Sequence, residues 1–174
     1  GFQIVNGDSV EVTPSAYVSL NAGEQAVVEI NYVIDDGAGN QTAQQTATIT
    51  ITGLNDSATI TGDTTGGVVE DTAVTDGQLT ANGVLSVNDV DNGQALFSTS
   101  VTGQAGNIGS LEITEAGLWS YSVQNDLQAI QQLADGAQIT DEFTVESVDG
   151  TAVQNIVITI TGVNDIAVIS GNNE

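Results

Sequence analysis

The sequence predicts an all-β protein built from antiparallel β-sandwich repeats, each with one short helix. The first observation behind this prediction is a series of short runs in which apolar and polar residues alternate. The second is that the whole pattern recurs about 110 residues further along the chain. Short strands separated by turns every 8–12 residues or so are typical of immunoglobulin-like and cadherin-like sandwiches.

The internal repeat sets the predicted domain organisation. Residues 49–56 read ITITGLND and residues 158–165 read ITITGVND, an offset of 109. Asp36-Gly37 matches Asp149-Gly150 at an offset of 113, so the first copy has four extra residues in its last hairpin loop. We therefore expect a truncated C-terminal half of a repeat at 1–56, a complete repeat at 57–165, and the start of a further repeat or linker at 166–174. The ends are abrupt, which suggests a piece of a longer array.

The strands are predicted from alternation with a period of two. In the clearest example, Ala47, Ile49 and Ile51 alternate with threonines. The Asp-Gly pairs at 36–37 and 149–150 predict tight turns after strands, and a further turn is expected at 88–93. The predicted strands are 27–34, 47–52, 84–87, 96–101, 119–123, 142–148 and 156–161.

One short helix is predicted in the complete copy. Leu127, Ile130 and Leu133 recur at helical spacing, with Asn125 as the expected N-cap and Gly136 beyond the end.

The half copy repeats this arrangement. Thr13 is the expected cap, and Pro14, the only proline of the chain, takes the first helical position, where proline is best tolerated. Tyr17 and Leu20 are expected to face inward, and Gly23 closes the helix. Two copies that follow the same capping rules strengthen the prediction.

The charge balance excludes several function classes. The 174 residues include 23 Asp and Glu but no Lys, Arg, His or Cys, for a net charge of −23. Nucleic-acid binding and adhesion to anionic membranes need cationic side chains. His- or Cys-dependent catalysis, typical zinc sites and disulfides are excluded as well. No apolar run reaches the length of a membrane span, and no signal peptide is seen at the start.

The same balance favours bound cations. Because no internal salt bridge between side chains can form, every carboxylate must interact with water, a backbone N–H or an external cation. Halophilic solvation is one explanation of the charge, and bound divalent ions are the other. Oxygen ligands suit calcium or magnesium.

The complete copy contains an ordered series of motifs. They are VEDT at 69–72, GVLSVNDVD at 83–91, GSLEITEAGLWSY at 109–121, LADG at 133–136, DEFTV at 141–145, SVDG at 147–150 and ITITGVND at 158–165. This series resembles the VCBS repeat, a cadherin-like module of large bacterial surface adhesins that often carry RTX-type secretion signals. The half copy, through VTPSAY at 12–17 and YVIDDG at 32–37, is similar to the sister form of the module. Ser57 and Ile166 depart from the family, which commonly continues into Ala-Pro.

The resemblance implies a non-catalytic extender of a secreted, repetitive bacterial adhesin at the cell surface, acting in cell adhesion or biofilm formation. Its partners would be neighbouring repeats of the same chain and a cell-surface or extracellular-matrix ligand. The alternative is a ligand-binding adhesin module that recognises carbohydrate or another adhesin, through its loops or the threonine row at 48, 50 and 52. A hydrolase using Glu112 and Glu115 beside Trp119 is a minor option, because no cleft is predicted and Trp119 falls in a core alternation.

The resemblance also implies calcium (Ca²⁺) at the repeat junctions, where cadherin-like linkers place an Asn-Asp pair and aspartates of the following domain complete the site. The competing explanation is that Asn-Asp and Asp-Gly are ordinary turn sequences. For Asp36 and Asp149 the turn-forming role fits better. The candidate metal ligands are Asn55, Asp56, Asp89, Asp91, Glu70, Asp36, Asp149, Asn164 and Asp165.

Overall fold

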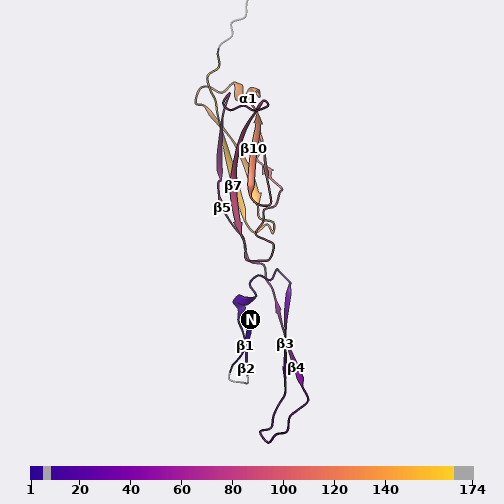
Figure 1. The fold of residues 1–174 in the computed structure, drawn as a ribbon. Helices are drawn as coiled ribbons and strands as arrows, with labels where there is room; N and C mark the ends of the chain where they lie inside the picture. Colours follow the sequence, from indigo (N-terminus) through magenta and orange to yellow (C-terminus); the bar gives the residue numbers. More distant parts are fainter. Residues whose placement is uncertain (6–8, 167–174) are drawn as a thin grey trace, which may run out of the picture. The chain divides into compact units, whose positions relative to one another are not determined.

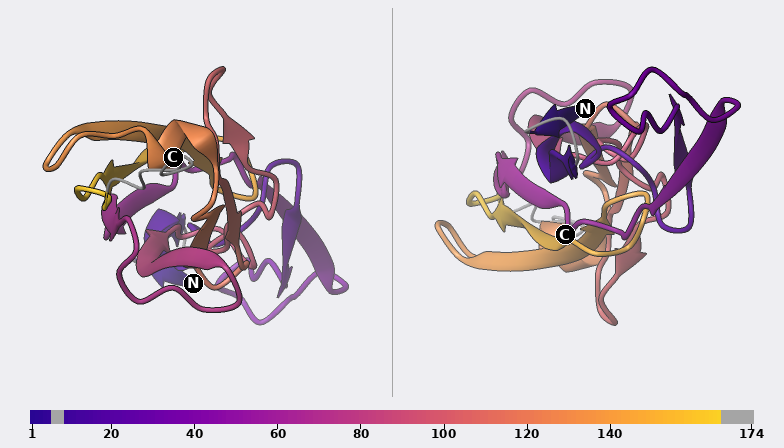
Figure 2. Two further views of the ribbon diagram at one scale, coloured as in Figure 1. Left: turned by 90° about the horizontal axis from the view of Figure 1, so that it is seen from above. Right: turned by 90° about the horizontal axis from the view of Figure 1, so that it is seen from below.

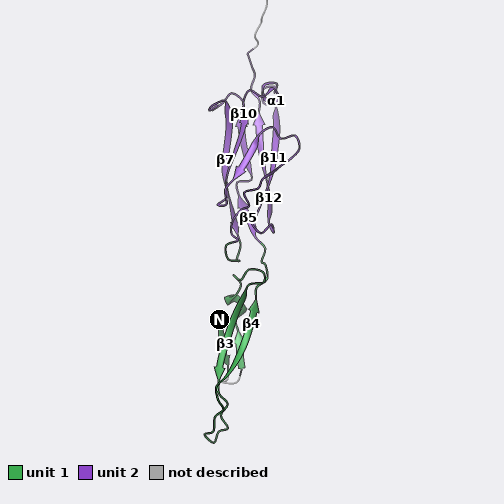
Figure 3. Ribbon diagram, turned by 90° about the vertical axis from the view of Figure 1, so that its right-hand side faces the viewer, with its two compact units in different colours: residues 1–57, 89–93 green, residues 58–88, 94–174 purple. Residues whose placement is uncertain are grey.

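The structure is a computed structural model that describes residues 1–5 and 9–166 (Figure 1). By contacts the chain divides into two compact units, which Figure 3 colours separately. Unit 1 comprises residues 1–57 together with the loop 89–93, and unit 2 comprises residues 58–88 and 94–174. The predicted start of a further repeat at 166–174 lies outside the described residues, apart from Ile166.

Unit 2 is a sandwich of two four-stranded sheets (Figures 1 and 2). All strand pairs are antiparallel except β6 and β12, which are parallel. The short helix α1 (Gln128–Gln131) follows β10. One sheet has the order β5 (Thr59–Gly62), β7 (Gln78–Asn88), β10 (Leu118–Gln124), β9 (Ser110–Ile113), and the other has the order β6 (Thr65–Val69), β12 (Val153–Thr161), β11 (Gln138–Glu146), β8 (Thr102–Gly103).

The core of unit 2 lies between its two sheets and follows the predicted alternation. Trp119, Tyr121 and Val123 of β10 are buried, with exposures of 2%, 0% and 3%, and their polar neighbours face outward. Three isoleucines of β12 oppose them and are fully buried. The Trp119 ring lies over Gly83 of β7, where a Cβ atom would clash with the ring. Gly83 therefore makes room for the largest core side chain.

Unit 1 contains two hairpins. β1 (Phe2–Val5) pairs with β2 (Ser9–Val12), and β3 (Gln25–Tyr32) pairs with β4 (Gln45–Thr52). A 3-10 turn, η1 (Pro14–Ala16), lies between them in the chain. Among the described residues of this unit, Val28 is the only buried large hydrophobic side chain, at 8% exposure.

The predicted fold class, an antiparallel immunoglobulin/cadherin-like β-sandwich with a short helix in each copy, is confirmed. Three local predictions are wrong. The half-copy helix expected from Pro14 to Gly23 is only the 3-10 turn η1, which ends at Ala16. Asn125 does not cap α1, whose N-cap is Leu127, because the Asn125 amide is bonded to Asp71. Residues 96–101 form no strand; Phe97 makes a single bridge to Ser147. In the part of the chain that the structure describes, no helix is long and apolar enough to cross a membrane.

Candidate functional site

The first candidate site is formed by Asp56, Asp89 and Asp91 within unit 1. The side chain of Asp91 is 3% exposed, and its Oδ2 accepts a 2.8 Å hydrogen bond from the backbone N–H of Asp56. The N–H of Asp91 donates to Oδ1 of Asp89, also at 2.8 Å. Within the described residues, the other two oxygens, Asp91 Oδ1 and Asp89 Oδ2, are buried and have no hydrogen-bond partner.

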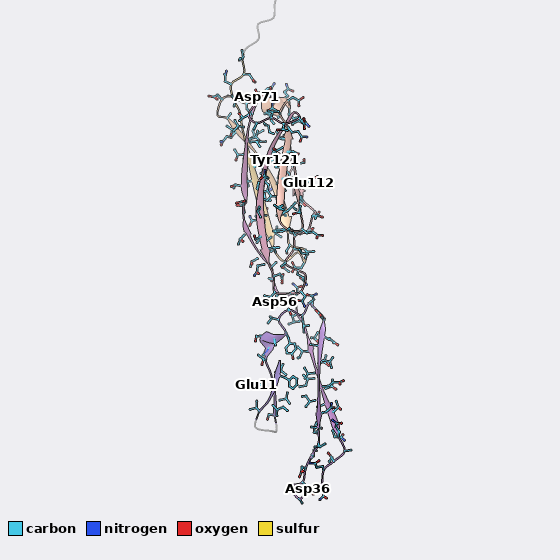
Figure 4. All side chains as sticks on the ribbon, in the orientation of Figure 1. Glu11, Asp36, Asp56, Asp71, Glu112 and Tyr121 are labelled. Atoms are coloured by element: carbon cyan, nitrogen blue, oxygen red, sulfur yellow. The ribbon has the colours of Figure 1, made fainter. Side chains whose placement is uncertain are left out.

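Local sequence explains this loop. Asp89 follows the last residue of β7, and an aspartate that accepts the N–H two residues on makes an Asx turn. Gly93 closes the loop with a φ of +74°, a conformation that favours glycine. Asn55 donates from its side-chain amide to the carbonyl of Asp56 at 2.6 Å. Asp56 itself is exposed, and Figure 4 labels its position beyond the end of β4.

The second candidate site is formed by Glu70 and the second Asn-Asp pair within unit 2. Glu70 is fully buried, and its Oε2 accepts a 2.9 Å hydrogen bond from the N–H of Val163. Its Oε1 is buried and has no partner in the described part of the chain. Asn164 donates to the carbonyl of Asp165 at 2.9 Å, as Asn55 does to Asp56.

The parallel pairing of β6 and β12 brings the residues of this second site together. Thr161, the last residue of β12, is paired with Val69, the last residue of β6. Parallel strands that end in register place the residues that follow them at the same sheet edge. Glu70 therefore lies beside Val163 although 93 positions separate them. Its neighbour Asp71 is exposed and bonded to Asn125.

Asp36 and Asp149 form turns. Oδ1 of Asp36 accepts the N–H groups of Ala38 and Asn40, and its Oδ2 accepts the Asn40 side-chain amide at 2.7 Å. These hydrogen bonds, that of the Asn40 side chain first, lower the pKa of Asp36. Asp149 accepts from the Ser147 hydroxyl at 2.6 Å and from the Thr151 N–H.

These two turns are remote from the two candidate sites of their own units. Asp36 lies at the end of the β3–β4 hairpin opposite to Asp56, as Figure 4 shows. Asp149 precedes β12, whereas Glu70 lies beyond the other end of that strand. Among the described residues, moreover, no group of three or more Asp or Glu side chains lies close enough to hold a metal ion. A metal at either Asn-Asp pair would therefore also need amide and backbone oxygens.

The alternation in β11 places a second buried carboxylate, Asp141, in the core of unit 2, where sequence reasoning did not single it out. Asp141 is 1% exposed, and its Oδ2 accepts from the Tyr121 hydroxyl and the Gly109 N–H, both at 2.7 Å. Its Oδ1 accepts from the Ile108 N–H at 3.0 Å. Both oxygens are used, so Asp141 anchors a loop rather than binding a ligand. The detectable signal was a charged residue at an inward position of an alternating strand.

Glu112, one of the two carboxylates considered for a sugar site, does not lie beside Trp119. Glu112 is exposed and lies opposite Ser120 in the β9–β10 pair, whereas Trp119 is opposite Ile113 and buried. Successive residues of a strand point to opposite faces of the sheet. Glu112, which is labelled in Figure 4, and Trp119 therefore lie on opposite faces of their sheet.

The fold defines the class of protein, a cadherin-like β-sandwich. The sequence model of the bacterial cadherin-like domain matches residues 55–162, and the chain belongs to that family. Membership indicates an adhesion or extender module, a class that is typically non-enzymatic and extracellular.

Solved structures with similarity to the chain include mouse clustered PcdhgC3 EC1-3, at 15% identity over 82% of this chain and 44% of that one, with a TM-score of 0.43. Zebrafish RET cadherin-like domains 1 to 4 match at 12% identity over 80% of this chain and 34% of that one, with a TM-score of 0.35. The chain thus spans less than half the length of either structure. No curated protein matches it.

Proposed function

We propose that this chain is an extender module of a secreted, repetitive bacterial adhesin of the VCBS and RTX type, acting in cell adhesion or biofilm formation. In this proposal residues 57–165 are one complete repeat, residues 1–56 belong to the preceding repeat, and calcium at the junctions stiffens the array. Membership of the bacterial cadherin-like family supports an adhesion or extender role. Arrays of this kind gain reach by adding units, and each junction sets the stiffness.

The observation that carries the calcium proposal is the set of buried, unpartnered carboxylate oxygens beside both Asn-Asp pairs. They are Oδ1 of Asp91, Oδ2 of Asp89 and Oε1 of Glu70. An ionised carboxylate that is buried without a partner is strongly unfavourable, and the sequence contains no Lys, Arg or His to pair with it. A hard cation that prefers oxygen ligands removes this cost.

The residues present fit such an ion. At the first pair the ligands would come from Asn55, Asp56, Asp89 and Asp91, and at the second from Glu70, Asn164 and Asp165. Calcium would supply the missing positive charge and would cross-link the Asn-Asp segment to the neighbouring carboxylates. The chain's own contribution is to hold these oxygens in place through the Asp56 N–H and the Val163 N–H before any ion binds.

Thermal unfolding with calcium and with a chelator, at low salt, tests this proposal. We expect calcium to raise the unfolding midpoint of the wild-type chain, and Asp91→Asn and Glu70→Gln each to reduce the rise. Glu112→Gln is the matched control, because Glu112 is exposed and the substitution changes the net charge equally. If calcium leaves the wild-type midpoint unchanged, calcium stiffening is wrong. If Glu112→Gln reduces the rise as much as the other two, the effect is only general charge screening.

A second experiment separates an extender from a ligand-binding module. An extender should bind nothing on a glycan array, and small-angle scattering should show the chain lengthen or stiffen with calcium. Specific glycan binding with no effect of calcium on the scattering would favour the ligand-binding alternative.

A further inference from the structure

Unit 1 and the second half of unit 2 have the same strand pairing. Ile4 pairs with Val10 in unit 1, and Ile113 pairs with Trp119 in unit 2, each residue shifted by 109. The second hairpins agree as well: Gln25 pairs with Thr52, and Gln138 pairs with Thr161. The strand residues of unit 1 therefore have structural equivalents in unit 2.

Equivalent positions differ sharply in burial. Phe2 is 46% exposed and its equivalent Leu111 is 6% exposed. Ile4 is 62% exposed, against 5% for Ile113. The hydrophobic residues of β1 and β2 are thus placed as core residues but remain open to solvent.

The cause is the set of strands present beside each hairpin. In unit 2, β7 pairs with the edge of β10 and β6 pairs with the edge of β12. Among the described residues of unit 1, the equivalent edges, those of β2 and β4, have no neighbouring strand. Between the two hairpins of unit 1 lies an open, mainly apolar groove of about 580 Å³, with a lining that includes Ile4, Val10, Ile30, Tyr32, Ile34 and Ala47.

We propose that this open face of unit 1 is a docking site for the leading half of a cadherin-like repeat, a polypeptide segment equivalent to residues 65–88. The occupant would add one strand to β2 and one to β4 and would fill the groove with its apolar side chains. Strand addition to a free edge supplies main-chain hydrogen bonds, and alternate side chains supply specificity. A free edge beside exposed apolar side chains is unfavourable unless it is covered.

The equivalence with unit 2 fixes the register. In unit 2, Trp119 pairs with Gly83 and Tyr121 pairs with Ala81. One strand of the occupant would therefore run antiparallel to β2, with its Gly83 equivalent opposite Val10 and its Ala81 equivalent opposite Val12. In unit 2, Ile158 pairs with Gly66 in a parallel arrangement. The other strand of the occupant would therefore run parallel to β4, with its Gly66 equivalent opposite Ile49.

The two strands of the proposed occupant carry no charge. Unit 1 carries carboxylates such as Glu11 and Glu29 and no basic side chain. β6 reads TGGVV and β7 reads QLTANGVLSVN, so neither strand carries a charge. The two docking strands therefore add no charge next to this acidic surface. The three carboxylates of the segment, Glu70, Asp71 and Asp76, lie in the connection between the strands.

This register places the Gly83 equivalent of the occupant beside Val10, where more space is open than in unit 2. Gly83 is required in unit 2 because the Trp119 ring occupies the space of its Cβ atom. Val10, which replaces the tryptophan in unit 1, is smaller and leaves that space open. A peptide of residues 65–88 with Gly83→Val should therefore bind unit 1 more tightly than the unchanged peptide.

The test titrates the full chain with a synthetic peptide of residues 65–88, in chelator so that calcium plays no part. We expect saturable binding by calorimetry, slower amide hydrogen exchange along β2 and β4, and tighter binding with Gly83→Val. The matched control peptide carries Leu79→Asp and Leu85→Asp, which replace two side chains that are fully buried in unit 2. We expect the control peptide not to bind.

A fusion that places a second copy of residues 58–109 directly ahead of Gly1 makes docking intramolecular, with the chain spacing of unit 2. Protection of β2 and β4 in the fusion is then expected even if the free peptide binds too weakly to detect. No protection in the fusion overturns the proposal. Equal binding of the control peptide overturns it as well, and so does self-association that protects β2 and β4 without peptide, because the occupant would then be a second copy.

Discussion

The hydroxyl of Tyr121 donates a 2.7 Å hydrogen bond to Oδ2 of Asp141, and both side chains are buried in the core of unit 2. With two backbone N–H groups also bonded to Asp141, its carboxylate has partners for both oxygens without any cation. This arrangement ties the turn at Ile108 and Gly109 to both sheets, because Tyr121 lies on β10 and Asp141 on β11.

Replacing Asp141 by leucine should strongly destabilise unit 2. The change leaves the Tyr121 hydroxyl and the N–H groups of Ile108 and Gly109 buried without acceptors, and each such group costs about 1–3 kcal/mol. We expect a loss in the free energy of unfolding of roughly 3 kcal/mol or more, measured by urea unfolding followed by the fluorescence of Trp119. The exposed Asp135 supplies the control Asp135→Leu. Similar losses in both variants would contradict the anchoring role.

The same pair predicts a loss of stability in alkali. The pKa of Tyr121 is raised above its usual value of 10.0 by burial, then by the hydrogen bond to Asp141 and by that residue's charge. A raised pKa means that the folded state holds the proton longer than the unfolded state. Its stabilising effect is therefore complete below pH 10 and is lost progressively above it. Unfolding curves from pH 9 to 11 or so should show the decline, and Tyr121→Phe should flatten it. An equal decline in the variant would mean that other groups are responsible.

Gly83→Ala should disturb the packing under Trp119. The added Cβ atom would clash with the indole ring, and overpacking of this kind typically costs about 1–3 kcal/mol. Gly67→Ala in β6 is the matched control, because the nearest atom to its added Cβ is the Thr159 carbonyl oxygen at an ordinary 3.6 Å. Thermal unfolding should separate the two variants, and equal midpoints would show that the ring moves aside at little cost.

Acid should loosen the turn at Asp36. The pKa of Asp36 lies below its usual 3.8, because its carboxylate accepts hydrogen bonds from the Asn40 side chain and from backbone N–H groups. The turn is therefore stabilised above that pH, and the effect is lost as the pH falls through the lowered pKa.

The measurement is the chemical shift of the Ala38 and Asn40 amides, whose hydrogen bonds to Asp36 are 2.8 and 3.1 Å long. Both should shift together during an acid titration, and Asp36→Ala should show the acid-like positions at neutral pH. If the chemical shifts of these two amides do not change during the titration, Asp36 does not have this role.

The sequence alone determined the features that depend on near neighbours in the chain. Period-two alternation identified β4, β10 and β12, because a strand exposes successive side chains to opposite faces whatever lies beyond. The repeat offset of 109 aligned the residues of β4 with those of β12, because nearly the same eight residues span the end of each strand. Trp119 was expected in the core from its alternation, and it is 2% exposed.

Only the tertiary structure decided which distant groups meet. Glu70 lies against Val163 through the parallel pairing of β6 and β12, and Asn125 is bonded to Asp71 instead of capping α1. The buried position of Asp141 depends on Tyr121 and on a turn some 32 residues away in the chain. Alternation predicts the face of a strand on which a side chain lies, but not which strand lies beside it. The partners of Glu70 and Asp141 and the open edges of unit 1 therefore follow only from the pairing and packing of the sheets.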